Sequence, residues 1–317
     1  MPAGQHENVM HVPVMVKEVL EYLSLKPGAK VIDCNIGEGG HAIEIIKNIG
    51  LSGRLLGIDR DTEAINSAGD NLTSVRSQVT LVHDEFINLS EIGLANDFTD
   101  VSGILFDLGL SGRQIETPGR GFSWRRDEPL DMRMDQSQGL TAAELIQASS
   151  EEDLIKVFRE YGEVQFASRL VKEMVKRRGK QRIVTTKDLA KLATEVAPQR
   201  TGNYRIHPAT TVFQALRIAV NAELKQLSDA LPQALSLLKS GGRIVIISFH
   251  SLEDRIVKNW LRQEAKDCIC PNEIPVCRCE HQAQLKILTK HPVIPSVDDL
   301  KENPRARSAK LRAGEKI

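Results

Sequence analysis

The feature that most constrains the fold is an apolar run that ends in clustered glycines, VIDCNIGEGGHA at residues 31–42. Gly37, Gly39 and Ala42 satisfy the spacing G-x-G-x-x-G/A, and helical spacing follows over residues 41–49. A strand, a glycine turn and a helix in this order are typical of an open parallel α/β sheet, in which the glycines let the backbone approach a nucleotide-like ligand. The alternative is a tight turn that binds nothing.

The rest of the first hundred residues repeats this alternation. An acidic residue ends two of the later apolar runs, Asp59 and Asp107. Alternating strands and helices predict a parallel sheet with crossover helices, which is an α/β fold. The expected strands are residues 30–34, 54–58, 79–82 and 101–106, and the expected helices are residues 14–23, 41–49 and 61–71.

The alternation stops after the fourth strand. Residues 109–133 are rich in Gly, Pro, Arg and Asp, and residues 141–196 have helical spacing only, opened by a Thr141–Glu144 capping box. Strand character returns at residues 243–249. We therefore predict an inserted all-helical domain. The predicted parts are residues 1–112 and 207–317, which form the α/β domain, and residues 113–206, which form the insertion.

The end of the chain predicts one more addition to the sheet. Residues 285–288 and 308–312 have strand character and are expected to pair as a hairpin. A reversed last strand at the edge of a parallel sheet is common in α/β folds.

Composition excludes several classes of protein. The chain has 317 residues, 42 basic and 42 acidic residues and 41% hydrophobic residues, which is ordinary for a globular protein with a core. No run is long enough to span a membrane, and the N-terminus lacks a signal-peptide pattern, so we expect a cytoplasmic protein. Zero net charge argues against a purely electrostatic nucleic-acid binder, although local patches could hold a structured RNA.

Four of the five cysteines form two close pairs, Cys268-x-Cys270 and Cys277-x-Cys279, with His281 beside them. In a cytosolic protein such pairs indicate a metal site or reduced thiols rather than disulfides. The C-x-C spacing is tighter than the usual C-x2-C of zinc sites, so a reduced loop is the favoured interpretation. No residue is assigned as a metal ligand.

The ligand at the glycine turn is either NAD or S-adenosylmethionine on geometry alone, with Asp59 placed to accept hydrogen bonds from a ribose. Three features favour S-adenosylmethionine. The helical insertion occupies the stretch where a dinucleotide fold needs its second half. Glu38 puts a negative charge into the turn, where a pyrophosphate would need free amides. The fourth strand ends in Asp107-Leu-Gly-Leu-Ser111, at the edge where the group to be methylated is placed.

Longer motifs carry a resemblance to a known family. The chain is similar to the bacterial 16S rRNA cytosine-N4 methyltransferases, the MraW-like family, over nearly its whole length. The strings RGFSWRRDEPLDMRMD and GGRIVIISFHSLEDRIVK are highly specific. The matching segments are residues 11–14, 37–41, 57–61, 106–114, 120–135, 160–169, 207–224, 241–258 and 302–312.

The resemblance implies a class I S-adenosylmethionine-dependent methyltransferase fold (Rossmann-like) with an inserted helical substrate-recognition domain. It implies methylation of the exocyclic N4 amine of a cytidine in the decoding region of 16S rRNA, free or in the 30S ribosomal subunit. Asp107 is the expected catalytic residue, and it either orients the amine or binds the methionine end of the donor. The expected cofactor-binding residues are Gly39, Gly40, His41, Asp59, Phe86, Asp107 and Gln114.

The chain departs from the family pattern at a few positions. Cys34-Asn35 stands where Gly-Thr is usual, and Gly112-Arg113 stands where Ser-Pro is usual. Trp124 stands where Phe is usual. Arg113, which the family pattern lacks, is interpreted either as an RNA contact or as a solvated side chain, and neither interpretation is favoured.

Several other side chains have two interpretations each. Phe122 and Trp124 could frame a cytidine that has left its stack, but an aromatic pair is more often core. The basic run at residues 176–182 is either a solvated helix end or a contact to RNA phosphates. His250 is either a wall of the active site or a satisfied loop residue. Asn221 is interpreted as a buried hydrogen-bonding residue.

Overall fold

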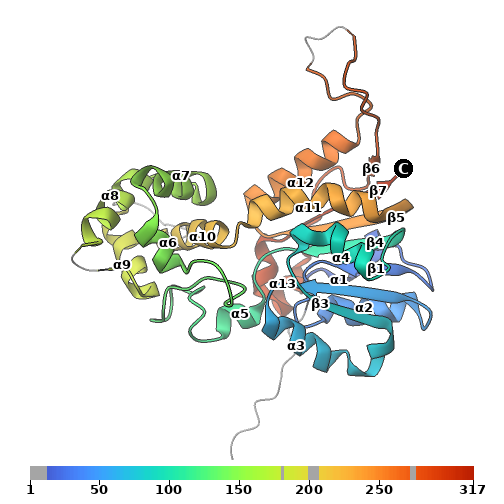
Figure 1. Ribbon diagram of the computed structural model, residues 1–317, viewed down its shortest axis with the longest axis horizontal. Helices are drawn as coiled ribbons and strands as arrows, with labels where there is room; N and C mark the ends of the chain where they lie inside the picture. Colours follow the sequence, from blue (N-terminus) through green and yellow to red (C-terminus); the bar gives the residue numbers. More distant parts are fainter. Residues whose placement is uncertain (1–12, 180–181, 199–206, 272–275) are drawn as a thin grey trace, which may run out of the picture. The chain divides into compact units, whose positions relative to one another are not determined.

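The computed structural model describes residues 13–179, 182–198, 207–271 and 276–317, and these residues form two compact units (Figure 1). The first unit runs to Gly109 and resumes at Gln226, and the second unit is Leu110–Lys225. The predicted insertion, residues 113–206, lies inside the second unit. The unit extends beyond it to residue 225, so the helix at residues 208–220 belongs to the helical unit.

The first unit contains a seven-stranded sheet in the order β3-β2-β1-β4-β5-β7-β6. Strands β1 to β5 are parallel, and β7 runs antiparallel to both β5 and β6. This is the Rossmann-like α/β fold expected from the sequence, with the expected hairpin at its edge. The strands are β1 Lys30–Asp33, β2 Arg54–Asp59, β3 Val79–His83, β4 Val101–Asp107, β5 Leu238–Ser248, β6 Leu285–Ile287 and β7 Lys310–Lys316.

Helices cover both faces of this sheet because successive residues of each strand point to opposite faces. Val31 and Leu55 pack in one apolar cluster with the first three helices, whereas Ile32 and Leu56 pack in the other cluster with the later helices. One face carries α1 Val16–Leu23, α2 Gly40–Ile49 and α3 Thr62–Asn71, and the other carries α4 Leu89–Ala95, α11 Glu223–Leu237 and α12 Ser251–Glu264. The unit also contains α13 Val297–Glu302 and the short 3-10 helices η1 Thr73–Gln78, η2 Phe86–Asn88 and η3 Pro304–Ser308.

Side-chain contacts stabilise the edge hairpin in addition to the backbone hydrogen bonds between its strands. Leu311 and Ala313 of β7 are fully buried, and the guanidinium Nε of Arg312 donates to Asp254 Oδ1 of α12 at 2.6 Å. A buried arginine of this kind is stable only because a carboxylate pairs with it.

In the described residues, no helix is both long and apolar enough to cross a membrane.

The second unit is helical, and its helices pack around an apolar core of their own. Helix α7 approaches the helix at residues 208–220 closely, since a Cβ at Gly162 would lie 2.6 Å from the carbonyl oxygen of Thr211. Thr185 caps the helix that follows it, where its hydroxyl accepts from the backbone N–H of Asp188 at 3.2 Å. The helices are α5 Gly112–Glu116, α6 Ala142–Ala148, α7 Glu151–Gly162, α8 Ala167–Arg177, α9 Thr186–Val196 and α10 Pro208–Val220.

Candidate active site

Three carboxylates lie at the carboxyl edge of the sheet, because each ends a parallel strand. Asp33 ends β1, Asp59 ends β2 and Asp107 ends β4. β1 lies between the other two strands, so the three ends are neighbours. Connections leave β1 in one direction and β4 in the other. Ligands of open α/β sheets bind at such a switch point, outside the carboxyl ends of the strands.

The glycine turn between β1 and α2 is tied to the end of β2. Gly37 donates its backbone N–H to Asp59 Oδ2 at 3.0 Å, and Asp61 donates its backbone N–H to Asp59 Oδ1 at 2.9 Å. Gly39 caps α2 with φ +87°, a conformation that other residues rarely adopt, and a Cβ there would lie 3.2 Å from Leu72 Cδ1. The turn therefore presents bare backbone beside a fixed carboxylate.

His41, in the first turn of α2, meets Asp107 across the switch point. Its Nε2 lies 3.5 Å from Asp107 Oδ2, and the histidine side chain is 5% exposed. Neither His41 Nε2 nor Asp107 Oδ1 has a hydrogen-bond partner, and Asn35 Oδ1 in the turn has none either. Buried polar atoms without partners are costly, so three of them at one sheet edge indicate a polar ligand.

Burial and mutual repulsion shift the protonation of this cluster. Burial, together with the charges of Asp107 and Asp59, raises the pKa of Asp33 to about 7, against the opposing effects of His41 and of the backbone N–H of Asn35. Burial likewise raises the pKa of Asp59 to about 6. Burial lowers the pKa of His41, but Asp107 and Asp33 outweigh it, so that its pKa lies above its ordinary value. Such shifts cluster at functional sites.

The structure thus brings five of the predicted residues to one place: Gly39, Gly40, His41, Asp59 and Asp107. Of the other two, Phe86 is buried in the apolar core, where its ring meets that of Phe106 edge to face at 5.6 Å. Gln114 lies in the helical unit, where it completes a capping box with Ser111.

Sequence reasoning missed Asp33 and the side chain of Asn35 as members of the site. Asp33 is 1% exposed and accepts a hydrogen bond from the backbone N–H of Asn35 at 3.2 Å. The signal was present, because Asp33 ends an apolar strand just as Asp59 and Asp107 do.

Three of the side chains singled out in the sequence lie in the helical unit. Asn221 accepts from the backbone N–H of Met134 at 2.9 Å and donates to the carbonyl of Met132 at 2.8 Å, which confirms its interpretation as a buried hydrogen-bonding residue. Phe122 is buried in the core of the unit. Trp124 is partly buried and stacks on His207, with ring centroids 4.2 Å apart.

Two other sequence candidates have structural partners. His250 caps α12, where its Nδ1 accepts from the backbone N–H of Glu253 at 3.4 Å. In the basic run, Arg177 pairs with Glu195 at 2.7 Å and Arg178 donates to the carbonyl of Ser149. Residues 180 and 181 of that run lie outside the described residues.

The two cysteine pairs converge. Their four sulfur atoms lie within 4.8 Å of one another, in the segment between α12 and β6. His281 lies apart from this group, with Nε2 3.2 Å from the carbonyl oxygen of Gln263.

Comparisons with known proteins agree with this geometry. A family model described as the MraW methylase family matches residues 8–317. The chain is 47% identical over 307 residues to the ribosomal RNA small subunit methyltransferase H of Syntrophotalea carbinolica, covering 97% of this chain and 98% of that protein. The protein of the same name from Halothermothrix orenii is also 47% identical with the same coverage, and that from Desulfosudis oleivorans is 44% identical over 97% of this chain and 99% of its own.

Proposed function

Because the chain belongs to the MraW methylase family, we propose that it transfers a methyl group to the exocyclic N4 amine of a cytidine in the decoding region of small-subunit rRNA. S-adenosylmethionine is the methyl donor. The observation that carries the proposal is the Asp107–His41 pair beside the glycine turn, with unpartnered polar atoms facing one sheet edge.

The residues at this edge fit such a donor, which supplies a methyl group activated by a sulfonium charge. Glycine at positions 39 and 40 keeps the turn tight, since a Cβ at either position would lie 3.2 Å from a neighbouring side chain. Asp59 is anchored by two backbone N–H groups and keeps lone pairs for ribose hydroxyls. Asn35 Oδ1 and the carboxylate of Asp33 suit a cationic amine.

Asp107 acts at the acceptor. The N4 lone pair of cytosine is delocalised into the ring, so an enzyme must hold the amine in line with the methyl group and favour a tetrahedral nitrogen. Asp107 Oδ1, which has no hydrogen-bond partner, accepts a hydrogen bond from the amine and takes up the proton that the nitrogen releases. His41, 3.5 Å from the other carboxylate oxygen, holds Asp107 in place.

The helical unit recognises the RNA in this proposal. Trp124 supports it: its ring is partly exposed, stacks on His207, and has the guanidinium of Arg125 5.8 Å from its centroid. Aromatic rings beside arginines stack on bases that have left a helix. Phe86 and Gln114 stay predicted donor-binding residues. The 30S subunit and the cytoplasm stay the predicted partner and location.

The test is incubation of the purified chain with methyl-labelled S-adenosylmethionine and 30S subunits that lack the modification, followed by nucleoside analysis. We expect label in N4-methylcytidine. The Asp107→Asn variant should lose roughly a hundredfold or more of the rate, because it keeps the shape and removes the charged acceptor. Label only in C5-methylcytidine would overturn the choice of acceptor atom.

A non-enzymatic alternative is an RNA-binding assembly factor that retains a donor pocket. It predicts that Asp107→Asn leaves rRNA methylation in cells unchanged. An NAD-dependent oxidoreductase, the other alternative, predicts calorimetric binding of NADH and none of S-adenosylhomocysteine. The family favours neither.

A further inference from the structure

An arm of the first unit, formed by residues 265–271 and 276–284, plays no part in the proposed methyl transfer. It extends beyond the end of α12 and returns to β6 (Figure 1). Its root is closed by backbone hydrogen bonds, with the N–H of Gln284 donating to the carbonyl of Glu264 at 2.8 Å. Beyond the root, Ile269 and Val276 are 43% and 68% exposed. None of the described residues of the arm joins an apolar core.

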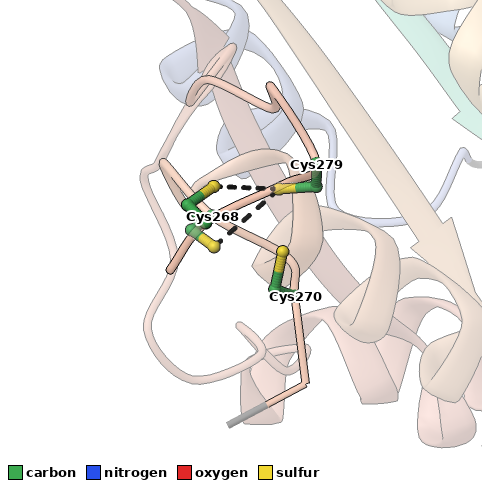
Figure 2. Close-up of side chains that lie close together, drawn as sticks. Cys268, Cys270 and Cys279 are labelled. Carbon is green, nitrogen blue, oxygen red and sulfur yellow. Dashed lines mark hydrogen bonds between the residues drawn. The ribbon is translucent and has the colours of Figure 1, made fainter. Parts of the chain in front are cut away.

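The described tip region nevertheless gathers four sulfur atoms from two separate pairs. Cys279 Sγ lies 3.6 Å from Cys277 Sγ and 3.8 Å from Cys268 Sγ, and the four sulfurs all lie within 4.8 Å of one another. Figure 2 shows the sulfur of Cys279 turned toward that of Cys268, with Cys270 beside them. Convergence of four thiols outside an apolar core is what a bound metal produces, because metal binding supplies the folding free energy of small metal sites.

These separations match one chemistry closely. Four thiolates at about 2.3 Å from a tetrahedral Zn²⁺ lie about 3.8 Å from each other. A disulfide would instead require sulfurs about 2.05 Å apart. All four cysteines are free in the structure.

The backbone around the sulfurs is arranged as it is around metal-bound thiolates. Ile269, between the first two cysteines, donates its N–H to Cys279 Sγ at 3.4 Å. Arg278, between the second two, donates its N–H to Cys270 Sγ at 3.4 Å. The two pairs thus exchange reciprocal N–H···S bonds, which orient the ligands and stabilise negative charge on sulfur.

We propose that Cys268, Cys270, Cys277 and Cys279 form a structural zinc site that holds the arm in one conformation. Four protein ligands complete the tetrahedron and leave no open position, so the site is structural rather than catalytic. A site of four sulfurs suits Zn²⁺, and iron is the other metal that such a site takes. The proposal is independent of the methyl-transfer chemistry.

The full-length chain, purified under reducing conditions without added metal, is analysed by inductively coupled plasma mass spectrometry. We expect about one zinc per chain. The double variant Cys270→Ser/Cys279→Ser should bind at most a tenth as much. The matched control is Cys34→Ser, which changes the fifth cysteine, buried in an apolar core directly after β1, and should retain its zinc.

Two further measurements keep the result independent of folding. Replacement of the metal by Co²⁺ should give the intense visible absorption of a tetrahedral tetrathiolate site in the wild type and the control, but not in the double variant. Circular dichroism should show the same cooperative unfolding in the wild type and the double variant, since the arm lies outside the apolar cores. Iron in place of zinc, a chain free of metal, or cysteines joined as disulfides in the reduced preparation would each overturn the proposal.

Discussion

At the scale of single residues, the site is governed by where carboxylates are buried. Asp33 is 1% exposed, and the negative charges of Asp59 and Asp107 at the same sheet edge raise its pKa. Its charge is therefore costly in the folded protein without a cationic ligand. This cost affects both the stability of the fold and the binding of the donor.

The first effect concerns stability. The folded pKa of Asp33 is about 7 against an ordinary 3.8, so the folded state binds more protons than the unfolded state between these values. The contribution of the Asp33 carboxyl to the free energy of unfolding therefore falls as pH rises from about 4 to about 7. Asp33→Asn should raise the free energy of unfolding by roughly 2–4 kcal/mol at pH 8 and change it little at pH 4.

Urea denaturation at both pH values measures this difference. Asp254→Asn serves as the control with the opposite sign, because Arg312 and Lys310 hold the pKa of Asp254 below its ordinary value despite partial burial. That variant should lose stability at pH 8. An equal gain for Asp33→Asn at both pH values would contradict the assignment of a buried, partly protonated carboxyl.

The second effect concerns binding of the donor. Ionised Asp33 and Asp59 attract a sulfonium and an ammonium group, so binding should release protons near pH 6, where both carboxyls are partly protonated. We expect the affinity for S-adenosylmethionine to rise roughly tenfold from pH 5.5 to pH 8. S-adenosylhomocysteine, which lacks the sulfonium charge, should show a smaller rise. Calorimetry in two buffers of different ionisation enthalpy reports the proton release, and its absence would count against this account.

At the scale of elements, the turn into α2 decides whether the site is open. Gly39 has φ +87°, and a Cβ there would press on Leu72 at 3.2 Å. Leu72 is fully buried at the C-terminal end of α3, so it cannot move away easily. The turn therefore depends on glycine for its conformation and for space.

Gly39→Ala should lower the free energy of unfolding by roughly 2–3 kcal/mol, from backbone strain and crowding together. It should also weaken donor binding at least tenfold. Gly241→Ala is the matched control, since Gly241 has φ +75° with nothing within 4 Å of its Cβ position. It should cost about 1 kcal/mol and leave donor affinity unchanged. Thermal denaturation and calorimetry separate the two effects, and equal affinities for both variants would contradict the crowding argument.

At the scale of the whole molecule, one late strand completes the sheet. β7 lies between β5 and β6, so both lose a hydrogen-bonded neighbour without it. Its residues Leu311 and Ala313 are fully buried, and Arg312 neutralises Asp254. The last segment of the chain is therefore part of the core of the first unit.

Removal of residues 310–317 should abolish cooperative unfolding and leave most of the chain insoluble, because it exposes apolar surface and two strand edges. Removal of Ile317 alone, which is 65% exposed, is the control and should leave the unfolding midpoint within a few degrees. Soluble yield and circular dichroism measure both. A cooperative transition in the longer truncation would show that the sheet is complete without β7.

Local sequence patterns are enough to predict most of the strands, turns and helix caps of this protein. Strands, the glycine turn and the Thr141 capping box were readable because they depend on residues at most four positions apart. The order of the motifs was enough to identify the family.

Residues that are distant in the chain acquire their shared roles only in the folded protein. Asp33 joined the site because β1 lies between β2 and β4, a neighbourhood that no local pattern contains. Helix α10 joined the helical unit because Gly162 lets it pack closely on α7. The spacing of the two cysteine pairs favours a reduced loop, whereas the fold places their four sulfurs within 4.8 Å of one another. Contacts between residues far apart in the chain arise from packing, which sequence spacing does not record.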